Sequence, residues 1–205
     1  MSSLGNNEPA LQQANWEALI LGIGNVLWAD EGFGVRCVEA LHERFEFPPS
    51  VCVMDGGTQG LFLLPWVSST DRLLILDAID FDLEPGTLKL IVGDDVPSYM
   101  GVKKVSMHQA GFQEVLSSAQ LSGEFPDEIA LIGVQPELLN DYGGSLTPIV
   151  KQQLEPALAF ASDVLRDWGI DVQERVDALP GEDRIGPGAL EIKDYEAGRP
   201  GGASA

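Results

Sequence analysis

The amino-acid sequence predicts a single α/β domain with a doubly wound, mainly parallel sheet, and two features support this class. The first is a set of short apolar runs of the kind that fill the middle of a parallel sheet, at residues 18–21, 51–54, 73–76 and 129–134. The second is the presence of helical patterns between most of these runs. Strands and helices that alternate in this way form parallel sheets, and the residues that follow each strand collect at one edge, where ligands bind.

The first strand and its helix carry the most distinctive pattern of the chain, within residues 18–37. The glycine-containing residues 22–25 end the strand, because they tolerate positive φ. A helix is then expected from about Glu31 to Phe45, since apolar residues recur there at helical spacing. The carboxylate pair formed by Asp30 and Glu31 therefore lies just beyond the carboxyl end of the first strand.

A dinucleotide-binding fingerprint is the main rival interpretation of these glycines. The pattern Gly22-x-Gly24 lacks the third glycine of the fingerprint, because the third position is Leu27. A phosphate at the start of the helix would also meet Asp30 and Glu31, whose negative charge repels it. Nucleotide binding is therefore a distant alternative, and a carboxylate at this place suits a cation better.

The composition excludes several classes of partner. The chain has 205 residues, a formal net charge of −20 and a pI of about 4.1, so its surface repels nucleic acid and anionic membranes. No apolar run approaches the roughly 20 residues that span a bilayer, and the first residues lack the features of a secretory signal. We therefore expect no membrane insertion and a cytoplasmic location. Cys37 and Cys52 are expected to be small buried hydrophobes rather than part of a disulfide framework.

The segments after the first helix repeat the pattern of strand, acidic turn and helix. The second strand is expected to end at Asp55, and residues 61–67 then form a short helix over the sheet. The third strand ends at Asp77 and is followed by an acidic loop. Residues 86–92 alternate between apolar and polar side chains, which indicates a further strand at an edge of the sheet.

A long connection and two helices complete the expected domain. Residues 93–105 are expected to be a long connection, of a length typical of functional or mobile loops. Ser106 is the expected N-cap of a helix that contains His108. After the strand at residues 129–134, Thr147-Pro148 predicts the start of a long helix with a kink at Pro156.

Both ends of the chain are expected to lie outside the folded domain, which spans residues 18–169. Residues 1–17 are polar and lack periodicity, which predicts a loose extension. Gly169 ends the last helix, and residues 170–205 then contain many glycines and little aliphatic periodicity. We expect this acidic tail to be mobile and dispensable for the core.

Four side chains are candidates for a site at the carboxyl edge of the sheet, namely Glu31, Asp55, Asp77 and His108. The amide of Gln135, which follows the strand at residues 129–134, is a weaker candidate. Two carboxylates and one imidazole form an oxygen and nitrogen site for a divalent borderline metal. A site with three protein ligands leaves coordination positions open.

Each candidate also has a purely structural explanation, and spacing alone leaves both explanations open. Glu31 could complement a helix dipole, and Asp77 could cap a turn. Asp55 could cap the short helix that follows it, and a single histidine such as His108 is more often structural than a ligand. The other histidine, His42, falls on the polar side of the first helix and is expected to be exposed.

The sequence lacks several common hydrolase motifs. No serine lies in a G-x-S-x-G elbow, and the zinc-binding pattern H-E-x-x-H is absent. A carboxylate pair could catalyse acid–base chemistry as in aspartic proteases, but that arrangement needs a symmetrical pair, and no such duplication is visible.

Six motifs in a fixed order resemble the [NiFe]-hydrogenase maturation endopeptidases. They are GIGNVLWADEGFGVRCVEAL from residue 22, DGGTQG at 55–60, LLILDAID at 73–80, SMHQAGFQEVL at 106–116, GEFPDEIALIGVQPE at 123–137 and LTPIVKQQLEPAL at 146–158. The resemblance covers about residues 18–168, which is nearly all of the expected domain. The first motif alone is already distinctive.

The resemblance implies a three-layer α/β/α fold and an endopeptidase of a family often catalogued as aspartic-type. Such an enzyme cuts a short C-terminal peptide from the precursor of a hydrogenase large subunit after nickel insertion. The implied partner is therefore that precursor, and the implied cofactor is the nickel that the precursor carries, for which other divalent metals are expected to substitute. The motif positions imply that Glu31, Asp77 and His108 bind the metal and that Asp55 supports them, without naming a separate catalytic residue.

Two other functions stay open at this stage. A non-enzymatic metal-binding maturation chaperone would bind the precursor and leave its mass unchanged. A stand-alone metal-dependent peptidase would cleave simple peptides without a nickel-loaded client. The precursor's mass after incubation with the protein separates these possibilities.

Overall fold

The computed structural model describes residues 15–102, 107–186, 190 and 192–198, and a five-stranded sheet lies at its centre. The strand order is β3-β1-β4-β6-β5, with β5 antiparallel to β6 at one edge and the other neighbours parallel. The strands are β1 (Ala18–Ile23), β3 (Val51–Gly57), β4 (Arg72–Ala78), β5 (Leu88–Val92) and β6 (Glu128–Val134). This confirms the expected mainly parallel sheet and the expected edge strand.

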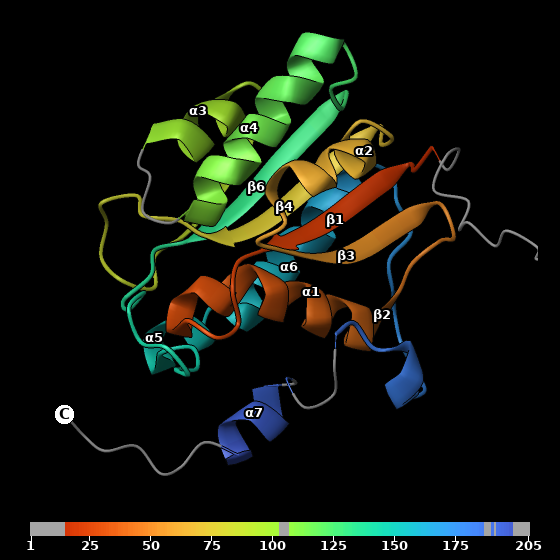
Figure 1. The fold of residues 1–205 in the computed structure, drawn as a ribbon. Helices are drawn as coiled ribbons and strands as arrows, with labels where there is room; N and C mark the ends of the chain where they lie inside the picture. Colours follow the sequence, from red (N-terminus) through yellow and green to blue (C-terminus); the bar gives the residue numbers. More distant parts are fainter. Residues whose placement is uncertain (1–14, 103–106, 187–189, 191, 199–205) are drawn as a thin grey trace, which may run out of the picture.

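Helices cover both faces of the sheet, as Figure 1 shows. One face carries α1 (Phe33–Arg44), α5 (Pro148–Lys151) and α6 (Leu154–Asp167). The other face carries α2 (Leu64–Val67), α3 (Asp95–Val102) and α4 (Met107–Ser122). The three-layer α/β/α fold is therefore confirmed.

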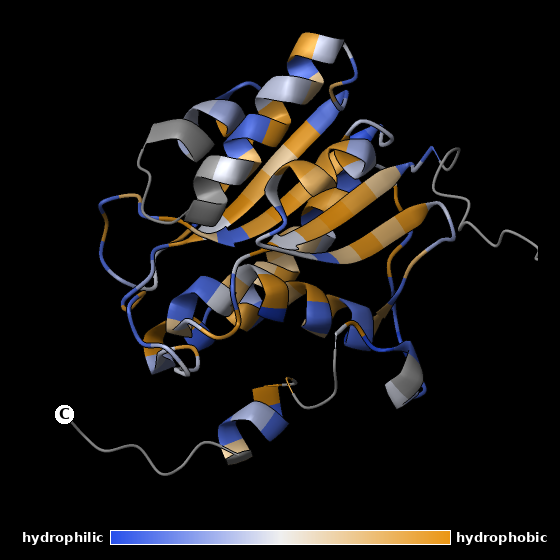
Figure 2. Cartoon of the chain, in the orientation of Figure 1, coloured by the Kyte–Doolittle hydropathy of each residue, from blue (hydrophilic) through white to orange (hydrophobic). Residues whose placement is uncertain are grey.

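A hydrophobic core lies between each face of the sheet and the helices that cover it. Successive residues of a strand point to opposite faces, so Ile20 packs in the core on the α1 side, while Leu19 and Leu21 pack in the core on the α4 side. Every residue of β1 is buried. Burial on both faces explains why the central strands are unbroken apolar runs, which Figure 2 shows in orange.

Two glycines allow the start of α1 to approach the sheet closely. A Cβ atom added to Gly34 would lie 2.0 Å from the carbonyl oxygen of Leu76 in β4. A Cβ atom added to Gly22 would lie 2.4 Å from the carbonyl oxygen of Gly34. Since no side chain fits in either place, the sequence of the first motif fixes the start of α1 against the carboxyl ends of β1 and β4.

The segment of residues 93–105 differs from its expected form. It was expected to be a long connection, but Asp95–Val102 form helix α3. Val96 is fully buried in the core on the α4 side, so tertiary packing stabilises a helix whose sequence pattern is weak. The expected N-cap Ser106 lies outside the described residues.

The helix expected to start at Thr147-Pro148 is divided into α5 and α6, which are separated at residues 152–153. The sequence predicted a kink at Pro156, and the break comes four residues earlier. A proline ring clashes with the carbonyl group four residues before it and has no N–H to donate to it, so the α-helical hydrogen-bond pattern is interrupted at Gln152 and Gln153. Pro156 then lies in the first turn of α6, where its missing N–H removes no intrahelical hydrogen bond.

The described part of the C-terminal segment lies against α1 (Figure 1). Strand β7 (Gln173–Glu174) pairs with β2 (Phe45–Glu46), and α7 (Ile192–Gly198) follows the 3-10 turn of Gly181–Asp183. His42 was expected to be exposed but is half-buried, because its Nε2 atom lies 2.9 Å from the carbonyl oxygen of Asp183. The mobility and dispensability of the tail stay predictions.

Two expectations from composition concern the thiols and the membrane. Cys37 is buried and Cys52 half-buried, both are free, and burial raises the pKa of each thiol, so they behave as small hydrophobes. Across the part of the chain that the structure describes, no helix has the length and apolar character needed to cross a membrane.

Candidate functional site

The site is built on three neighbouring strands at the carboxyl edge of the sheet. In the sheet register, Gly22 of β1 lies opposite Asp55 of β3 on one side and Leu76 of β4 on the other, so Asp77 is one residue further along β4. With neighbouring strands about 4.8 Å apart, the backbones of Asp55 and Asp77 are roughly 10 Å apart, with β1 between them. Glu31 follows β1 and therefore enters from the middle of this edge.

Asp77 is fully buried near the end of β4. Its Oδ1 atom accepts a hydrogen bond from the backbone N–H of Ala78 at 2.8 Å. Burying a carboxylate is costly unless hydrogen bonds or a cation stabilise its charge. The backbone contact of Asp77 is compatible with the turn cap that was its structural alternative, and its role as a metal ligand stays a prediction.

Glu31 lies in the 3-10 turn η1 (Ala29–Gly32), so the helix expected from Glu31 starts with this turn, and α1 follows it. The turn is held tightly against the glycine motif, because a Cβ atom added to Gly24 would lie 1.8 Å from the carbonyl oxygen of Glu31. Gly24 has φ +136, a conformation that side-chain-bearing residues rarely adopt. The backbone N–H of Asn25 donates to the same Glu31 carbonyl at 3.0 Å. The glycine motif therefore positions Glu31 rather than a phosphate.

Asp30 has a different role from its neighbour in the expected carboxylate pair. It is fully buried, and its Oδ2 atom accepts hydrogen bonds from the backbone N–H groups of Glu137 at 2.9 Å and Leu138 at 2.8 Å. Its carboxylate also accepts from the N–H of Thr147 at 2.7 Å and from the Thr147 hydroxyl at 3.1 Å. Asp30 thus joins the loop after β1 to the loop after β6. Of the carboxylate pair that the sequence suggested, Asp30 has a structural role, and only Glu31 remains a candidate for the site.

Asp55 lies within β3, which extends two residues beyond its expected end at Asp55, to Gly57. Its Oδ1 atom accepts a hydrogen bond from the N–H of Gly57 at 2.8 Å, so the side chain folds back on its own strand end and does not cap the following short helix, which was its structural alternative. Burial raises the pKa of Asp55, although the Gly57 hydrogen bond and the charge of Arg36 oppose the shift. A carboxyl group with a raised pKa at a sheet edge is a candidate for a supporting role in the chemistry.

His108 lies in the first turn of α4, and its side chain is outside the described part of the structure. One turn further along this helix, a Cβ atom added to Gly111 would lie 3.4 Å from the Cα atom of Gly60, in the turn η2 (Gly60–Leu63) that follows β3. Figure 1 shows the start of α4 at the same edge as the arrowheads of β1 and β4. The backbone of His108 therefore lies at the edge that carries Glu31 and Asp77.

The described side chains include no group of three or more His, Cys, Asp and Glu residues that could hold a metal ion. The three expected ligands could not form such a group there, because the His108 side chain is outside this set. Glu31 and Asp77 thus lie at one edge of the sheet, with His108 on the helix that begins beside them, and their role as metal ligands stays a prediction.

Gln135, the weaker candidate, has a structural role. It is buried, and its Oε1 atom accepts hydrogen bonds from the N–H groups of Phe81 at 2.7 Å and Leu83 at 3.2 Å. Its Nε2 atom donates to Asp80 at 3.1 Å. Gln135 therefore shapes the acidic loop after β4. Sequence reasoning missed this role and that of Asp30, since the partners lie 52 or more residues away along the chain.

These residues define an α/β protein with a carboxylate site at the carboxyl edge of its sheet, chemically suited to a divalent metal. Comparisons with known proteins give the family. The family model of the hydrogenase maturation proteases matches residues 35–164, and the chain belongs to this family.

Individual relatives are similar over most of the chain. Hydrogenase expression/formation protein HoxM of Azotobacter vinelandii is 55% identical over 182 residues, which cover 89% of this chain and 86% of the relative. Hydrogenase 2 maturation protease of Escherichia coli is 42% identical over 158 residues, 77% of this chain and 95% of the relative. The solved structure of the hydrogenase maturating endopeptidase HybD from E. coli superposes with a TM-score of 0.75 at 41% identity, over 79% of this chain and 99% of HybD.

Proposed function

We propose that this protein removes a short C-terminal peptide from the nickel-loaded precursor of a [NiFe]-hydrogenase large subunit. Membership of the hydrogenase maturation protease family supports an endopeptidase activity. The observation that carries the proposal is the convergence of Glu31, Asp77 and the first turn of the helix with His108 at one edge of the sheet. Nickel is part of the substrate, and it serves as the element by which the enzyme recognises a precursor ready for processing.

The chemistry of the three side chains fits recognition of a metal that another protein already holds. Two carboxylates and a neutral imidazole are good ligands for nickel, and three ligands do not complete its coordination. Binding to the client's metal would bring the client's C-terminal segment to the sheet edge. The metal, or groups that it orients, would then polarise the scissile carbonyl or activate water.

The protein supplies a rigid frame for these ligands. Asp77 is near the end of a central strand that is buried on both faces. Glu31 lies in the same turn as Asp30, which is fixed by four hydrogen bonds. A site held in this way needs little rearrangement when the client binds. Asp55 lies at the same edge on the other side of β1, and its proposed role is to support the site rather than to bind the metal.

Intact mass of the client tests the proposal. A purified large-subunit precursor, with and without nickel, is incubated with the protein or with its Glu31→Gln, Asp77→Asn and His108→Ala variants. We expect the C-terminal peptide to be lost only with nickel, and each variant to lower the rate by at least about 100-fold, since even indirect partners of metal ligands are worth 10–100-fold.

Asp167→Asn is the matched control, because Asp167 is an exposed carboxylate in the last turn of α6 and lies outside the acidic loops of the carboxyl edge. It loses one negative charge without touching the proposed ligands and is expected to process at the unaltered rate. Complex formation without any change in precursor mass would contradict the proposed endopeptidase activity and favour a metal-binding maturation chaperone. Cleavage of nickel-free precursor would contradict the role of nickel in recognition.

A further inference from the structure

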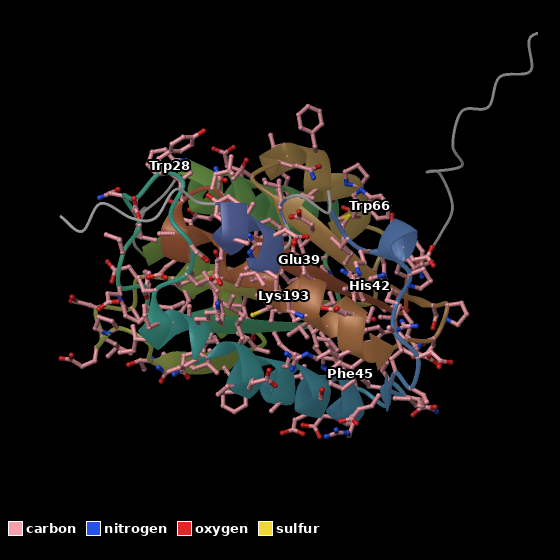
Figure 3. All side chains as sticks on the ribbon, turned by 90° about the horizontal axis from the view of Figure 1, so that it is seen from below. Trp28, Glu39, His42, Phe45, Trp66 and Lys193 are labelled. Atoms are coloured by element: carbon pink, nitrogen blue, oxygen red, sulfur yellow. The ribbon has the colours of Figure 1, made fainter. Side chains whose placement is uncertain are left out.

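Two exposed aromatic side chains lie in contact beside the proposed nickel ligand Glu31. The exposed fractions of Trp28 and Tyr142 are 36% and 69%, and their ring centroids are 5.3 Å apart in an edge-to-face arrangement. Figure 3 shows Trp28 at the margin of the molecule, well away from His42 and Lys193. Adjacent exposed aromatic rings are a common feature of binding surfaces.

The aromatic pair is held in place by the backbone. Trp28 forms β-bridges with Tyr142 and Gly144, and the N–H of Gly143 donates to the carbonyl oxygen of Leu27 at 2.7 Å. The buried carboxylate of Asp30 joins the same two loops. The backbone that carries the rings therefore has little conformational freedom to lose when a ligand binds, and this favours affinity.

The strand-end segments that carry the pair contain charge of one sign, although Lys151 reaches Glu196 beside Ser145. The segments that follow β1, β4 and β6, at residues 24–32, 79–87 and 135–147, contain no Lys, Arg or His. Their seven acidic residues are Asp30, Glu31, Asp80, Asp82, Glu84, Glu137 and Asp141. Aromatic faces attract cations, and neighbouring carboxylates strengthen that attraction. The surface is thus complementary to a cationic side chain rather than to a purely apolar one.

We propose that Trp28 and Tyr142 bind a Lys or Arg side chain in the C-terminal segment of the client precursor. This inference rests on the proposed function. The N–H of Glu31 donates to the carbonyl oxygen of Trp28 at 3.0 Å, so the cation subsite is directly beside the proposed nickel ligand. A client whose nickel contacts Glu31 would place the adjoining part of its segment over the aromatic pair, and the subsite would select segments with a cation at that distance from the metal.

Steady-state processing of the nickel-loaded precursor at low ionic strength tests the subsite, using Trp28→Leu and Tyr142→Leu. We expect each variant to raise KM about twofold to fivefold with kcat unchanged, since an exposed cation–π contact is of that strength. Tyr142→Phe keeps the ring and should retain the unaltered KM. Phe160→Leu on α6 is the matched control, because Phe160 is also an exposed aromatic residue, 37% accessible, on a helix that covers one face of the sheet.

The client provides the second arm of the experiment. Replacing the Lys and Arg residues of its C-terminal segment by Gln should raise KM by the same factor, with no further rise when combined with Trp28→Leu. Unchanged KM in both Leu variants, or a rise that is independent of the client's cations, would overturn the subsite while wild-type cleavage leaves the proposed function intact. Loss of a dimer on Trp28→Leu would also overturn it, by showing that the pair contacts a second copy. No cleavage by the wild-type protein would overturn the proposed function and the subsite together.

Discussion

At the scale of single residues, the carboxyl groups of the site differ through their surroundings. Asp30 is buried and accepts four hydrogen bonds, Asp77 is buried near the end of a central strand, and Asp55 is partly buried with one backbone donor. Hydrogen-bond donors stabilise a carboxylate, whereas burial destabilises it. Residues of one chemical type in one region can therefore serve as a structural tie, a ligand and a supporting group.

Asp55 gives a pH-dependent prediction for stability. Burial raises its pKa above the ordinary value of 3.8, while the Gly57 hydrogen bond and Arg36 oppose the shift. The folded protein therefore binds the proton more tightly than the unfolded chain does. As pH rises from 3.8 to the raised value, the unfolded chain loses its proton first, and the free energy of unfolding falls. Above this window the whole penalty persists.

The Asp55→Asn variant removes the ionisation and keeps an oxygen that can accept from the N–H of Gly57. We expect it to be more stable than the wild-type protein at pH 7 and equally stable at about pH 3, where both forms are neutral. Urea unfolding at the two pH values measures the difference. A stabilisation of the same size at both pH values would show that the charge of Asp55 is not its cause.

At the scale of elements, the site depends on two loops that are far apart in sequence. The loop after β1 carries Glu31 and Trp28, and the loop after β6 carries Tyr142 and the N–H groups that bind Asp30. Neither loop has a strand or long helix to define its shape, and their mutual hydrogen bonds replace one. The position of Glu31 is therefore coupled to residues more than 100 positions away in the chain.

Asp30→Ala should separate these loops. It removes the shared acceptor of three part-buried backbone N–H groups. Because Glu137 and Leu138 are exposed residues whose N–H groups can partly hydrate, we expect a loss of about 1–3 kcal/mol in the free energy of unfolding. Urea unfolding measures the loss. Asp167→Ala, at an exposed position in the last turn of α6, is the control and should change stability by less than about 0.5 kcal/mol. Equal effects of the two substitutions would contradict the role of Asp30.

The sequence allowed the strands and the site positions to be predicted for a local reason. β1, β4 and β6 are buried on both faces and so are continuous apolar runs, and a carboxylate such as Asp77 at the end of such a run must lie at the sheet edge. The role of Asp30, the α3 helix and the position of the break before Pro156 were not predicted. Each depends on a contact between segments, on tertiary burial or on the choice between two nearby helix boundaries, which local patterns do not encode.

At the scale of the whole molecule, charge is unevenly distributed. Six of the 12 Lys and Arg residues line a groove of about 960 Å³ between α1, α6 and the C-terminal segment. They are Arg36, Arg44, Arg166, Arg175, Arg184 and Lys193. Figure 3 labels Glu39, His42 and Lys193, which line this groove. That groove is also lined by six Asp and Glu residues, so its charge is balanced, whereas the segments 24–32, 79–87 and 135–147 at the carboxyl edge contain only acidic charge.

This distribution predicts opposite effects of salt on stability and on client binding. A net charge of −20 makes the folded chain repel itself, and salt screens that repulsion, because the Debye length falls from about 30 Å at 0.01 M to about 8 Å at 0.15 M. The melting temperature should therefore rise with added NaCl.

The same screening weakens attraction between the acidic edge and a cationic client segment, so KM for the nickel-loaded precursor should also rise. Thermal unfolding and processing kinetics over one NaCl series measure both effects, and choline chloride replaces NaCl to separate screening from sodium binding. If the melting temperature rises with salt while KM stays constant, the negative charge affects the stability of the folded protein but does not contribute to client binding.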